Sequence, residues 1–269
     1  MGHRYDGVAL EKSAAKSAQH ITLYFETLYR AWGPQHWWPA ESAFEVIVGA
    51  YLTQNTSWTN VERALAKLRR ERVLSVRGIR RTTLRKLERL IRSSGYFRQK
   101  SRRLKAFVGF LDRRYGGSLA RMFAQPTAEL REELLSLNGV GPETADSILL
   151  YAGNHAVFVV DAYTRRIVER HGLATAGGTY DELRILFEQA LFPFAMNSQS
   201  TLLPDVFSAA GPKGSCHPPS RMSTARRSPE AQLFNEMHGL IVGVGKNFCK
   251  KSQPDCERCP LQTFLPGTK

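Results

Sequence analysis

The sequence lacks a long apolar run. Nowhere in its 269 residues does a segment approach the roughly 18–20 consecutive apolar residues of a membrane span, so we expect no membrane insertion. The opening segment, MGHRYDGVALEKSAAKS, also lacks the apolar core of a secretion signal. A cytoplasmic protein is therefore expected. In that reducing compartment its four cysteines need not form disulfides.

Acidic residues are scarce relative to basic ones. The chain has 24 Asp and Glu against 38 Lys and Arg, which gives a formal net charge of +14. This balance favours a polyanionic partner such as nucleic acid, and hence a nucleoid-associated protein. Ribosome-like proteins and merely soluble basic proteins share such a charge. Hydrophobic residues make up 42% of the chain, which indicates a globular core rather than disorder.

Alternating strand patterns are almost absent, and there is no internal repeat. Apolar residues instead recur at helical spacing, which predicts a mainly α-helical fold. The expected helices lie near residues 21–32, 44–52, 61–68, 82–93, 100–115, 130–137, 148–152 and 231–244. The segment 197–230 is rich in Ser, Pro and Gly, and we expect it to be a flexible insertion.

The stretch LNGVGPETADSILLYAGNHAVFVVD, residues 137–161, is the most informative. Asn138 to Gly141 predict a tight hairpin between two helices, and Pro142 suits the first position of the second helix. The two glycines permit a sharp turn and a close approach to another surface. The free amides at the new helix start favour an anion such as a DNA phosphate. An ordinary corner between two helices is the alternative.

Asp161 follows the apolar run 157–160 and precedes a helical pattern. An aspartate at this position caps a helix well. Half-buried at the positive end of a helix, it stays ionised at neutral pH. A fixed carboxylate stabilises a cationic sugar or activates a water molecule. Capping and catalysis are both compatible with the pattern.

Three of the four tryptophans, Trp37, Trp38 and Trp58, bracket a predicted helix that ends in the polar sequence TQNTS. Core packing is the ordinary role of a tryptophan. The alternative is a pocket wall that stacks an extruded base, because an electron-rich ring suits an alkylated, positively charged purine. Gln54 and Asn55 either fill the gap left in a duplex or cap the helix.

A strongly basic segment spans residues 67–105, and most of it is expected to be a solvated helical face. Within it, GYFRQKSRR (95–103) places a glycine turn before a helix start that lies beside cations. Lys100 is the predicted phosphate contact in this segment.

The C-terminal region contains Cys249, Cys256 and Cys259, spaced C-x6-C-x2-C. This spacing suggests iron–sulfur ligation. Leu265 stands five residues beyond the last cysteine, where a fourth thiolate is missing, and Cys216 supplies one only if its loop folds back. Two interpretations stay open: a 4Fe–4S cluster, and three ordinary thiols of a degraded site.

Together, LNGVGPETA, VVDAYTRR, TQNTSW, GYFRQK and the cysteine spacing resemble the helix-hairpin-helix (HhH-GPD) DNA glycosylase superfamily, on its endonuclease III side. WWPAESAFEVIVGAYLTQNTSW further resembles the 3-methyladenine DNA glycosylases related to endonuclease III. The resemblance implies an all-α, two-domain fold with the DNA and a flipped base between the domains. Residues 40–155 would carry the hairpin, and 1–39 with 156–269 would form the second domain.

The resemblance also implies roles for individual residues. Asp161 takes the place of the essential aspartate. Glu143 either assists by contacting the base or the water, or only favours the start of its helix. The implied DNA contacts are Gln54 as a wedge, with Asn55, Lys100, Gly139, Val140, Gly141 and Thr144. The implied base pocket consists of Trp37, Pro39, Trp58 and Lys246.

Two positions depart from the family pattern. Glu143 stands where backbone-cutting members have the lysine that forms a Schiff base, a reaction that a carboxylate cannot perform. Leu265 stands in the slot of the fourth cluster cysteine. We therefore expect a monomeric, monofunctional base excision repair glycosylase that binds damaged double-stranded DNA and releases an alkylated purine such as 3-methyladenine. The alternatives are specificity for oxidised pyrimidine, uracil or mismatched adenine, and a non-catalytic DNA-binding protein.

Overall fold

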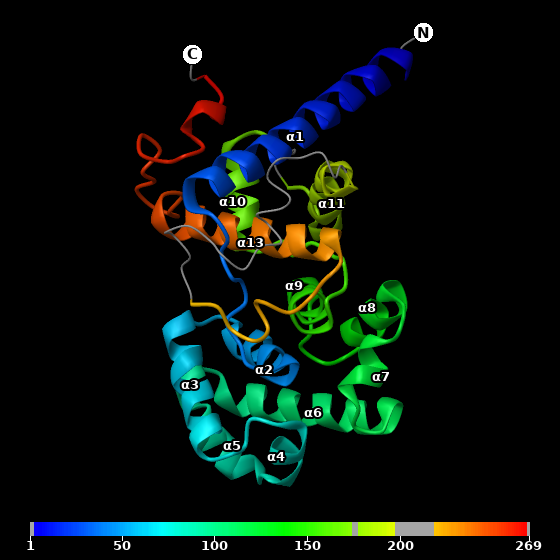
Figure 1. Ribbon diagram of the computed structural model, residues 1–269, viewed down its shortest axis with the longest axis vertical. Coiled ribbons are helices and arrows are strands. Elements are labelled where there is room, and N and C mark those ends of the chain that lie inside the picture. The colour runs from blue at the N-terminus through cyan, green and yellow to red at the C-terminus, as the bar shows by residue number, and fades with distance from the viewer. Residues whose placement is uncertain (1–2, 174–176, 197–217, 268–269) are drawn as a thin grey trace. The chain divides into compact units, whose positions relative to one another are not determined.

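The computed structural model describes residues 3–173, 177–196 and 218–267. Within these ranges every regular element is a helix, which confirms the predicted all-α fold (Figure 1). The chain divides into two compact units. Unit 1 comprises Met1–Pro39 and Ala156–Lys269, and unit 2 comprises Ala40–His155.

Unit 1 is built around one long buried helix, α13. The elements of the unit are α1 (His3–Trp32), α10 (Ala162–Arg170), α11 (Tyr180–Met196), α13 (Pro229–Asn247) and the short η3 (Gln262–Phe264). Helix α13 packs against α1, α10 and α11, and α1 also packs against α11 (Figure 1). Ser228 caps α13 by accepting a hydrogen bond from the Ala231 amide. Side chains on α13 are therefore held from several directions.

Unit 2 is a cluster of shorter helices around α2. Its elements are α2 (Ala43–Thr53), α3 (Trp58–Arg70), α4 (Val76–Arg81), α5 (Leu84–Leu90), η1 (Arg92–Ser94), α6 (Phe97–Tyr115), α7 (Leu119–Phe123), α8 (Thr127–Leu135), α9 (Pro142–Ser147) and the π-helical η2 (Ile148–Ala152). Residues 44–52 are all buried, because α2 packs against η2, α3, α6 and α9. A helix that is apolar on every side is expected to lie inside a unit.

The predicted insertion at 197–230 is partly wrong. Residues 197–217 lie outside the described part of the chain. Residues 218–228 form turns in which Met222 and Ser223 are buried, and the Arg227 guanidinium donates to the Met222 carbonyl at 2.6 Å. Burial of an apolar side chain orders this segment despite its polar composition. Helix α13 then begins at Pro229, inside the range predicted to be flexible.

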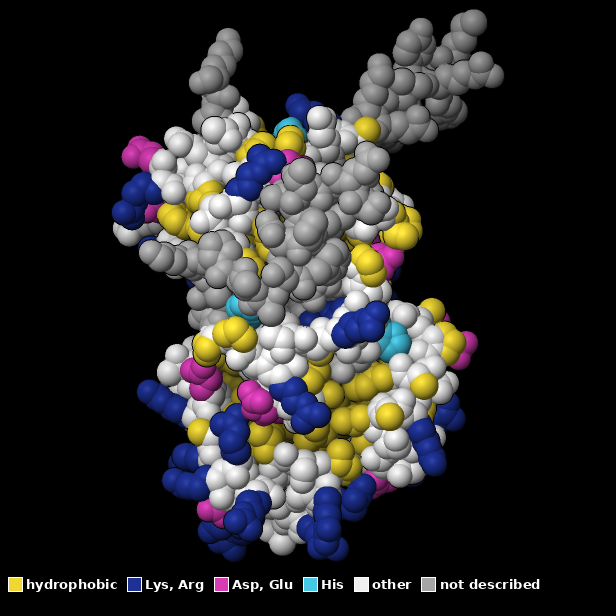
Figure 2. All heavy atoms as spheres, viewed as in Figure 1, with side chains coloured by type: hydrophobic (Ala, Val, Ile, Leu, Met, Phe, Trp, Pro, Cys, Tyr) yellow, Lys and Arg dark blue, Asp and Glu magenta, His cyan; other side chains and the backbone are white. Residues whose placement is uncertain are grey.

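The surface of unit 2 is rich in basic side chains. Figure 2 shows Lys and Arg spread over its visible face around α3–α6, where acidic side chains are fewer. Across the described ranges, every helix is too short or too polar to cross a bilayer.

Candidate active site

The predicted hairpin between α8 and α9 is present. Gly139 has a φ of 79°, in the left-handed region that favours glycine. The Val140 amide donates to the Leu137 carbonyl at 3.0 Å, and the Ala145 amide donates to the Gly141 carbonyl at 2.9 Å. Pro142 is the first residue of α9, as predicted. The amide and the buried side chain of Val140 both anchor the hairpin, and a DNA contact by this residue stays a prediction.

Gln54, at the end of α2, is bonded to the hairpin. Its Nε2 donates to the Gly139 carbonyl and to the Thr144 hydroxyl, both at 3.0 Å. Its Oε1 accepts from the Arg103 guanidinium at 2.8 Å. These bonds tie the end of α2 and the first half of α6 to the hairpin. Insertion of Gln54 into a duplex would require their release, and it stays a prediction.

Arg103 and Asn55 complete this region. Sequence analysis did not single out Arg103, since it lies in a run of basic residues without a distinguishing pattern. It packs so closely on the hairpin that a Cβ on Gly139 would lie 2.0 Å from its Nε. Asn55 is exposed with a φ of 53°, just beyond the end of α2. Asparagine is common at this position after a helix, which explains it without a ligand.

Lys100 is a correction to the predicted phosphate contact. Its side chain is only 1% exposed, and its Nζ donates to the Leu52 carbonyl at 2.8 Å and the Ser94 carbonyl at 2.6 Å. Burial lowers the pKa of this amine to about 8. The ammonium binds the carbonyl end of α2 instead of a phosphate, because a cation is favourable at a helix C-terminus.

Lys100→Met is therefore expected to lower stability. The variant keeps the length of the side chain but leaves two buried carbonyls without their donor, at a cost of about 2–3 kcal/mol. Urea unfolding measures this loss, and Arg102→Met, at an exposed neighbouring position, is the control that should leave stability unchanged. Weaker DNA binding by Lys100→Met at unchanged stability would contradict the structural role.

In unit 1, Asp161 is the N-cap of α10. Its Oδ1 accepts from the Thr164 amide at 2.8 Å and from the Thr164 hydroxyl at 3.0 Å. The preceding apolar run, 157–160, is buried and holds the residue at the helix start. The predicted capping role is confirmed. The side chain remains 13% exposed, so its carboxylate is not sealed from solvent.

The second carboxylate oxygen of Asp161 faces His238 on α13. The His238 Nε2 lies 3.7 Å from Oδ2. The imidazole stands among the rings of Trp37 and Phe158, at centroid distances of 5.9 and 6.3 Å. Burial lowers the pKa of His238, and the Asp161 charge opposes that shift. The sequence carries no signal for His238, because only the fold brings it to Asp161.

Trp37 and Lys246, both predicted to line the base pocket, lie together in unit 1. The Lys246 Nζ is 5.7 Å from the centroid of the Trp37 ring, a cation–π contact. Trp37 itself is mostly buried, whereas Lys246 is exposed on the last turn of α13. The described part of unit 1 thus gathers the carboxylate of Asp161, the imidazole of His238, an indole and an ammonium.

The loop that carries Trp37 is fixed to α13 by a buried carboxylate. Glu236 accepts a hydrogen bond from the Gln35 amide at 2.7 Å, and burial raises its pKa to about 7. Gly239 permits the side chain of Gln35 to pack directly against α13, since a Cβ at Gly239 would lie 2.9 Å from Gln35 Cβ. The peptide bond between Trp37 and Trp38 is cis.

The remaining predicted residues lie elsewhere. Trp58 begins α3 in unit 2, where its indole donates to the Glu62 carboxylate at 2.9 Å. Pro39 is partly exposed at the end of the Trp37 loop. Glu143 is exposed in the first turn of α9, a position at which a carboxylate is favourable. Roles for these residues in base binding or catalysis stay predictions.

The cysteine segment is held by two arginines of α10. Arg166 donates to the Cys249 carbonyl at 2.5 Å, and Arg170 donates to the Cys249 thiol at 3.2 Å. Burial raises the pKa of the Cys259 thiol. Among the described residues, no group of three or more His, Cys, Asp or Glu side chains is arranged to hold a metal ion.

Among the described residues, Cys249, Cys256 and Cys259 supply three thiols where a 4Fe–4S cluster takes four thiolates, and the cluster stays a prediction. Leu265 stands at the fourth position with an apolar side chain, and Cys216 lies outside the described ranges.

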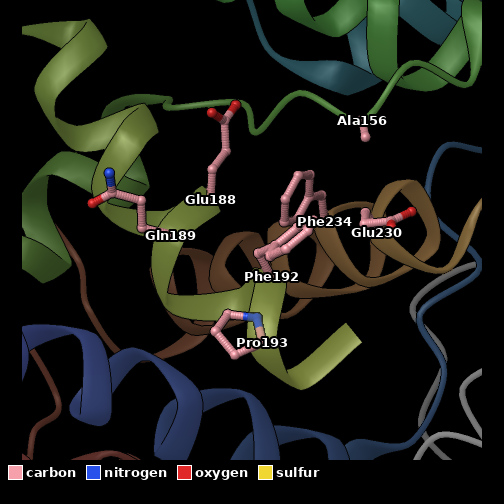
Figure 3. Close-up of a pocket in the computed structure, with 7 residues that line it drawn as sticks. All are labelled: Ala156, Glu188, Gln189, Phe192, Pro193, Glu230 and Phe234. Atoms are coloured by element: carbon pink, nitrogen blue, oxygen red, sulfur yellow. The ribbon is translucent and has the colours of Figure 1, made fainter. Parts of the chain in front are cut away.

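A separate apolar pocket of about 570 Å³ lies between α11 and α13 (Figure 3). Phe192 and Pro193 line it from α11, and Phe234 lines it from α13 (Figure 3). Neither Asp161 nor Trp37 contributes to this lining. The pocket is therefore distinct from the carboxylate site.

An all-helical fold with a glycine hairpin and an aspartate cap defines the class of helix-hairpin-helix repair proteins. The model of the HhH-GPD superfamily of base excision DNA repair proteins matches residues 48–193. The chain therefore belongs to this superfamily, and it is a DNA glycosylase of base excision repair.

Individual relatives agree with this assignment. The chain is 39% identical over 246 residues to MJ1434 of Methanocaldococcus jannaschii, provisionally named a DNA repair glycosylase, with 91% of this chain and 94% of that protein covered. It is 27% identical to endonuclease III of Thermotoga maritima, covering 81% and 80%. The crystal structure of H. pylori 3-methyladenine DNA glycosylase (MagIII) bound to 1,N6-ethenoadenine is similar, with a TM-score of 0.66, 27% identity and coverage of 86% and 97%.

Proposed function

We propose that the protein is a monofunctional DNA glycosylase that hydrolyses the N-glycosidic bond of an alkylated purine, such as 3-methyladenine, in duplex DNA. The observation that carries the proposal is the Asp161 carboxylate. One oxygen is fixed by the α10 cap, and the other is directed toward His238 in an aromatic surrounding. A fixed anion of this kind is suited to a developing positive charge on a sugar.

Two further observations support the alkylated purine. The face of Trp37 attracts a cation, as its contact with Lys246 shows, and a purine nucleotide methylated at N3 is cationic. The H. pylori relative is named a 3-methyladenine DNA glycosylase, and this chain covers nearly all of its length.

The proposed reaction needs little acid catalysis. The basic surface of unit 2 and the hairpin hold the DNA backbone, and the damaged nucleotide leaves the stack. As the glycosidic bond lengthens, its electron pair goes to the purine, which leaves as a neutral base. Asp161 stabilises the resulting cationic sugar and takes the proton of the water that attacks the anomeric carbon. The products are the free base and an abasic site.

The proposed enzyme does not cut the DNA strand. Strand cleavage by the family's lyase route requires an amine that attacks the sugar, and Glu143 offers a carboxylate instead. Borohydride treatment of the protein with substrate DNA is therefore expected to give no covalent adduct. A robust adduct would contradict the monofunctional assignment and would indicate that another amine attacks the sugar.

A lesion panel tests the substrate. Duplexes with methylated purines, an oxidised pyrimidine, uracil or mismatched adenine are incubated with the protein, and the released bases are separated and identified. We expect free 3-methyladenine and intact strands until alkali is added. Preferential release of another base would overturn the proposed specificity, and binding without any release would overturn the proposed activity.

A further inference from the structure

His238 is the one ionisable side chain that the structure places against the second oxygen of Asp161 within the described part of unit 1. Thr164 already satisfies Oδ1 twice, so Oδ1 is committed to the α10 cap. Oδ2 is the oxygen left to act on a sugar or a water. Its orientation therefore depends on the group that faces it, which is the His238 Nε2 at 3.7 Å.

We propose that His238 is a positioning residue for Asp161, and that its Nε2–H group directs Oδ2 without neutralising the carboxylate. This inference rests on the proposed function, because it assigns Asp161 to the reaction. At 3.7 Å the contact is longer than a hydrogen bond, and such contacts shorten when substrate fills a site.

A neutral donor matches the chemistry better than a charged one. A lysine or a protonated histidine at this position would form an ion pair with Asp161 and weaken its attraction for a cationic sugar. The side chain of His238 is 5% exposed and lies among the rings of Trp37 and Phe158. Burial lowers the pKa of His238, which favours the neutral imidazole, and the adjacent carboxylate opposes that shift.

The packing of α10 against α13 sets the distance between the two side chains. Gly245 of α13 accommodates the Tyr163 ring of α10, since a Cβ at Gly245 would lie 2.2 Å from Tyr163 Cδ1. Arg166 of α10 donates to the Gly245 carbonyl at 3.2 Å. Asp161 begins α10, and His238 lies two turns before Gly245 on α13. This close helix contact therefore places the imidazole at the carboxylate.

Three substitutions at His238 separate positioning from packing. Gln places an amide N–H near the position of Nε2, Asn places one near Nδ1, and Leu removes every donor. Single-turnover base release, affinity for DNA with an abasic analogue, and melting temperature are measured for each. His171→Leu is the matched control, because His171 is another buried histidine of unit 1. Its Nδ1 lies 2.7 Å from the Tyr24 hydroxyl, with which it forms a hydrogen bond, and it does not contact Asp161.

We expect His238→Gln to retain base release within about threefold. His238→Leu and His238→Asn should each lose about 30-fold, which corresponds to removal of a hydrogen bond to a charged group. DNA affinity should stay unchanged in all three. His171→Leu should lower the melting temperature without changing the rate of base release. When Asp161→Asn is already present, His238→Leu should reduce the rate of base release by less than a further factor of about two, because positioning acts through the carboxylate.

If His238 had a purely structural role, the order of activities among its variants would be reversed. Leucine suits an apolar surrounding better than glutamine, so His238→Leu would then be as active as wild type and more stable than His238→Gln. That order, or equal loss in the Gln and Asn variants, would overturn the inference. If His238→Leu does not fold, the rates of base release of His238→Gln and His238→Asn still test the inference, because both substitutions are polar and differ in where they place the N–H group. Failure of the proposed function is distinct from these outcomes: the wild-type protein itself would then release no base.

Discussion

Asp161→Asn is expected to reduce base release by about a thousandfold while DNA binding is retained. Asparagine has the same shape and keeps the Oδ1 acceptor that receives the Thr164 amide and hydroxyl. It is also as good an N-cap as aspartate, so α10 should remain intact. The variant therefore removes the negative charge and replaces the Oδ2 acceptor with an amide donor, while the helix cap is kept. Single-turnover release of the base measures the loss, and binding to DNA with an abasic analogue shows that the fold is preserved.

Thr164→Val is the matched control for that substitution. It removes the 3.0 Å hydrogen bond from the Thr164 hydroxyl to Asp161 Oδ1 but keeps the carboxylate and the bond from the Thr164 amide. A hydrogen bond to a charged group contributes about 1.5–3 kcal/mol, but this one holds Oδ1 in the helix cap and leaves Oδ2 in place, so stability should fall while base release falls less than about tenfold. Full activity of Asp161→Asn would refute the proposed mechanism, whatever the effect of Thr164→Val.

Local signals predict much of this structure. Glycine, proline and aspartate each restrict the backbone within a few residues, so the hairpin at Gly139, the helix start at Pro142 and the cap at Asp161 were all predicted in the right places. Helical periodicity likewise identified the all-α fold. The turn at 218–228 was missed because its composition is polar, and burial of Met222 is decided by the rest of the unit.

Contacts between distant positions were not predictable in the same way. Lys100 was expected on the surface as one of many basic residues, yet it bonds a carbonyl 48 positions away. Arg103 reaches Gln54 from 49 positions away, and His238 faces Asp161 from another helix. Charge and spacing do not specify which basic residue turns inward. That choice depends on unpaired carbonyls and on side-chain packing, which only the folded chain defines.

Gly139→Ala is expected to weaken DNA binding about 100-fold and to destabilise the protein. Alanine at a φ of 79° costs about 1–2 kcal/mol. Its Cβ would also lie 2.0 Å from Arg103 Nε, so the guanidinium must leave the hairpin and release Gln54. Loss of the aligned hairpin amides removes an anion-binding surface worth about 2–3 kcal/mol. Fluorescence anisotropy with duplex DNA and urea unfolding measure the two effects.

Gly141→Ala tests whether glycine is needed for the fold of the free protein or for the close approach of DNA. Gly141 has an ordinary φ of −95°, and a Cβ there would meet no atom within 4 Å. The free protein should therefore keep its stability. A phosphate on the hairpin would nevertheless meet the new methyl group, because glycine at such a site permits close approach of the backbone. We expect DNA affinity to fall about tenfold at unchanged stability. Unchanged affinity would mean that the open side of Gly141 does not face DNA. Glycine would then be required by the fold at Gly139 and would have no role at Gly141.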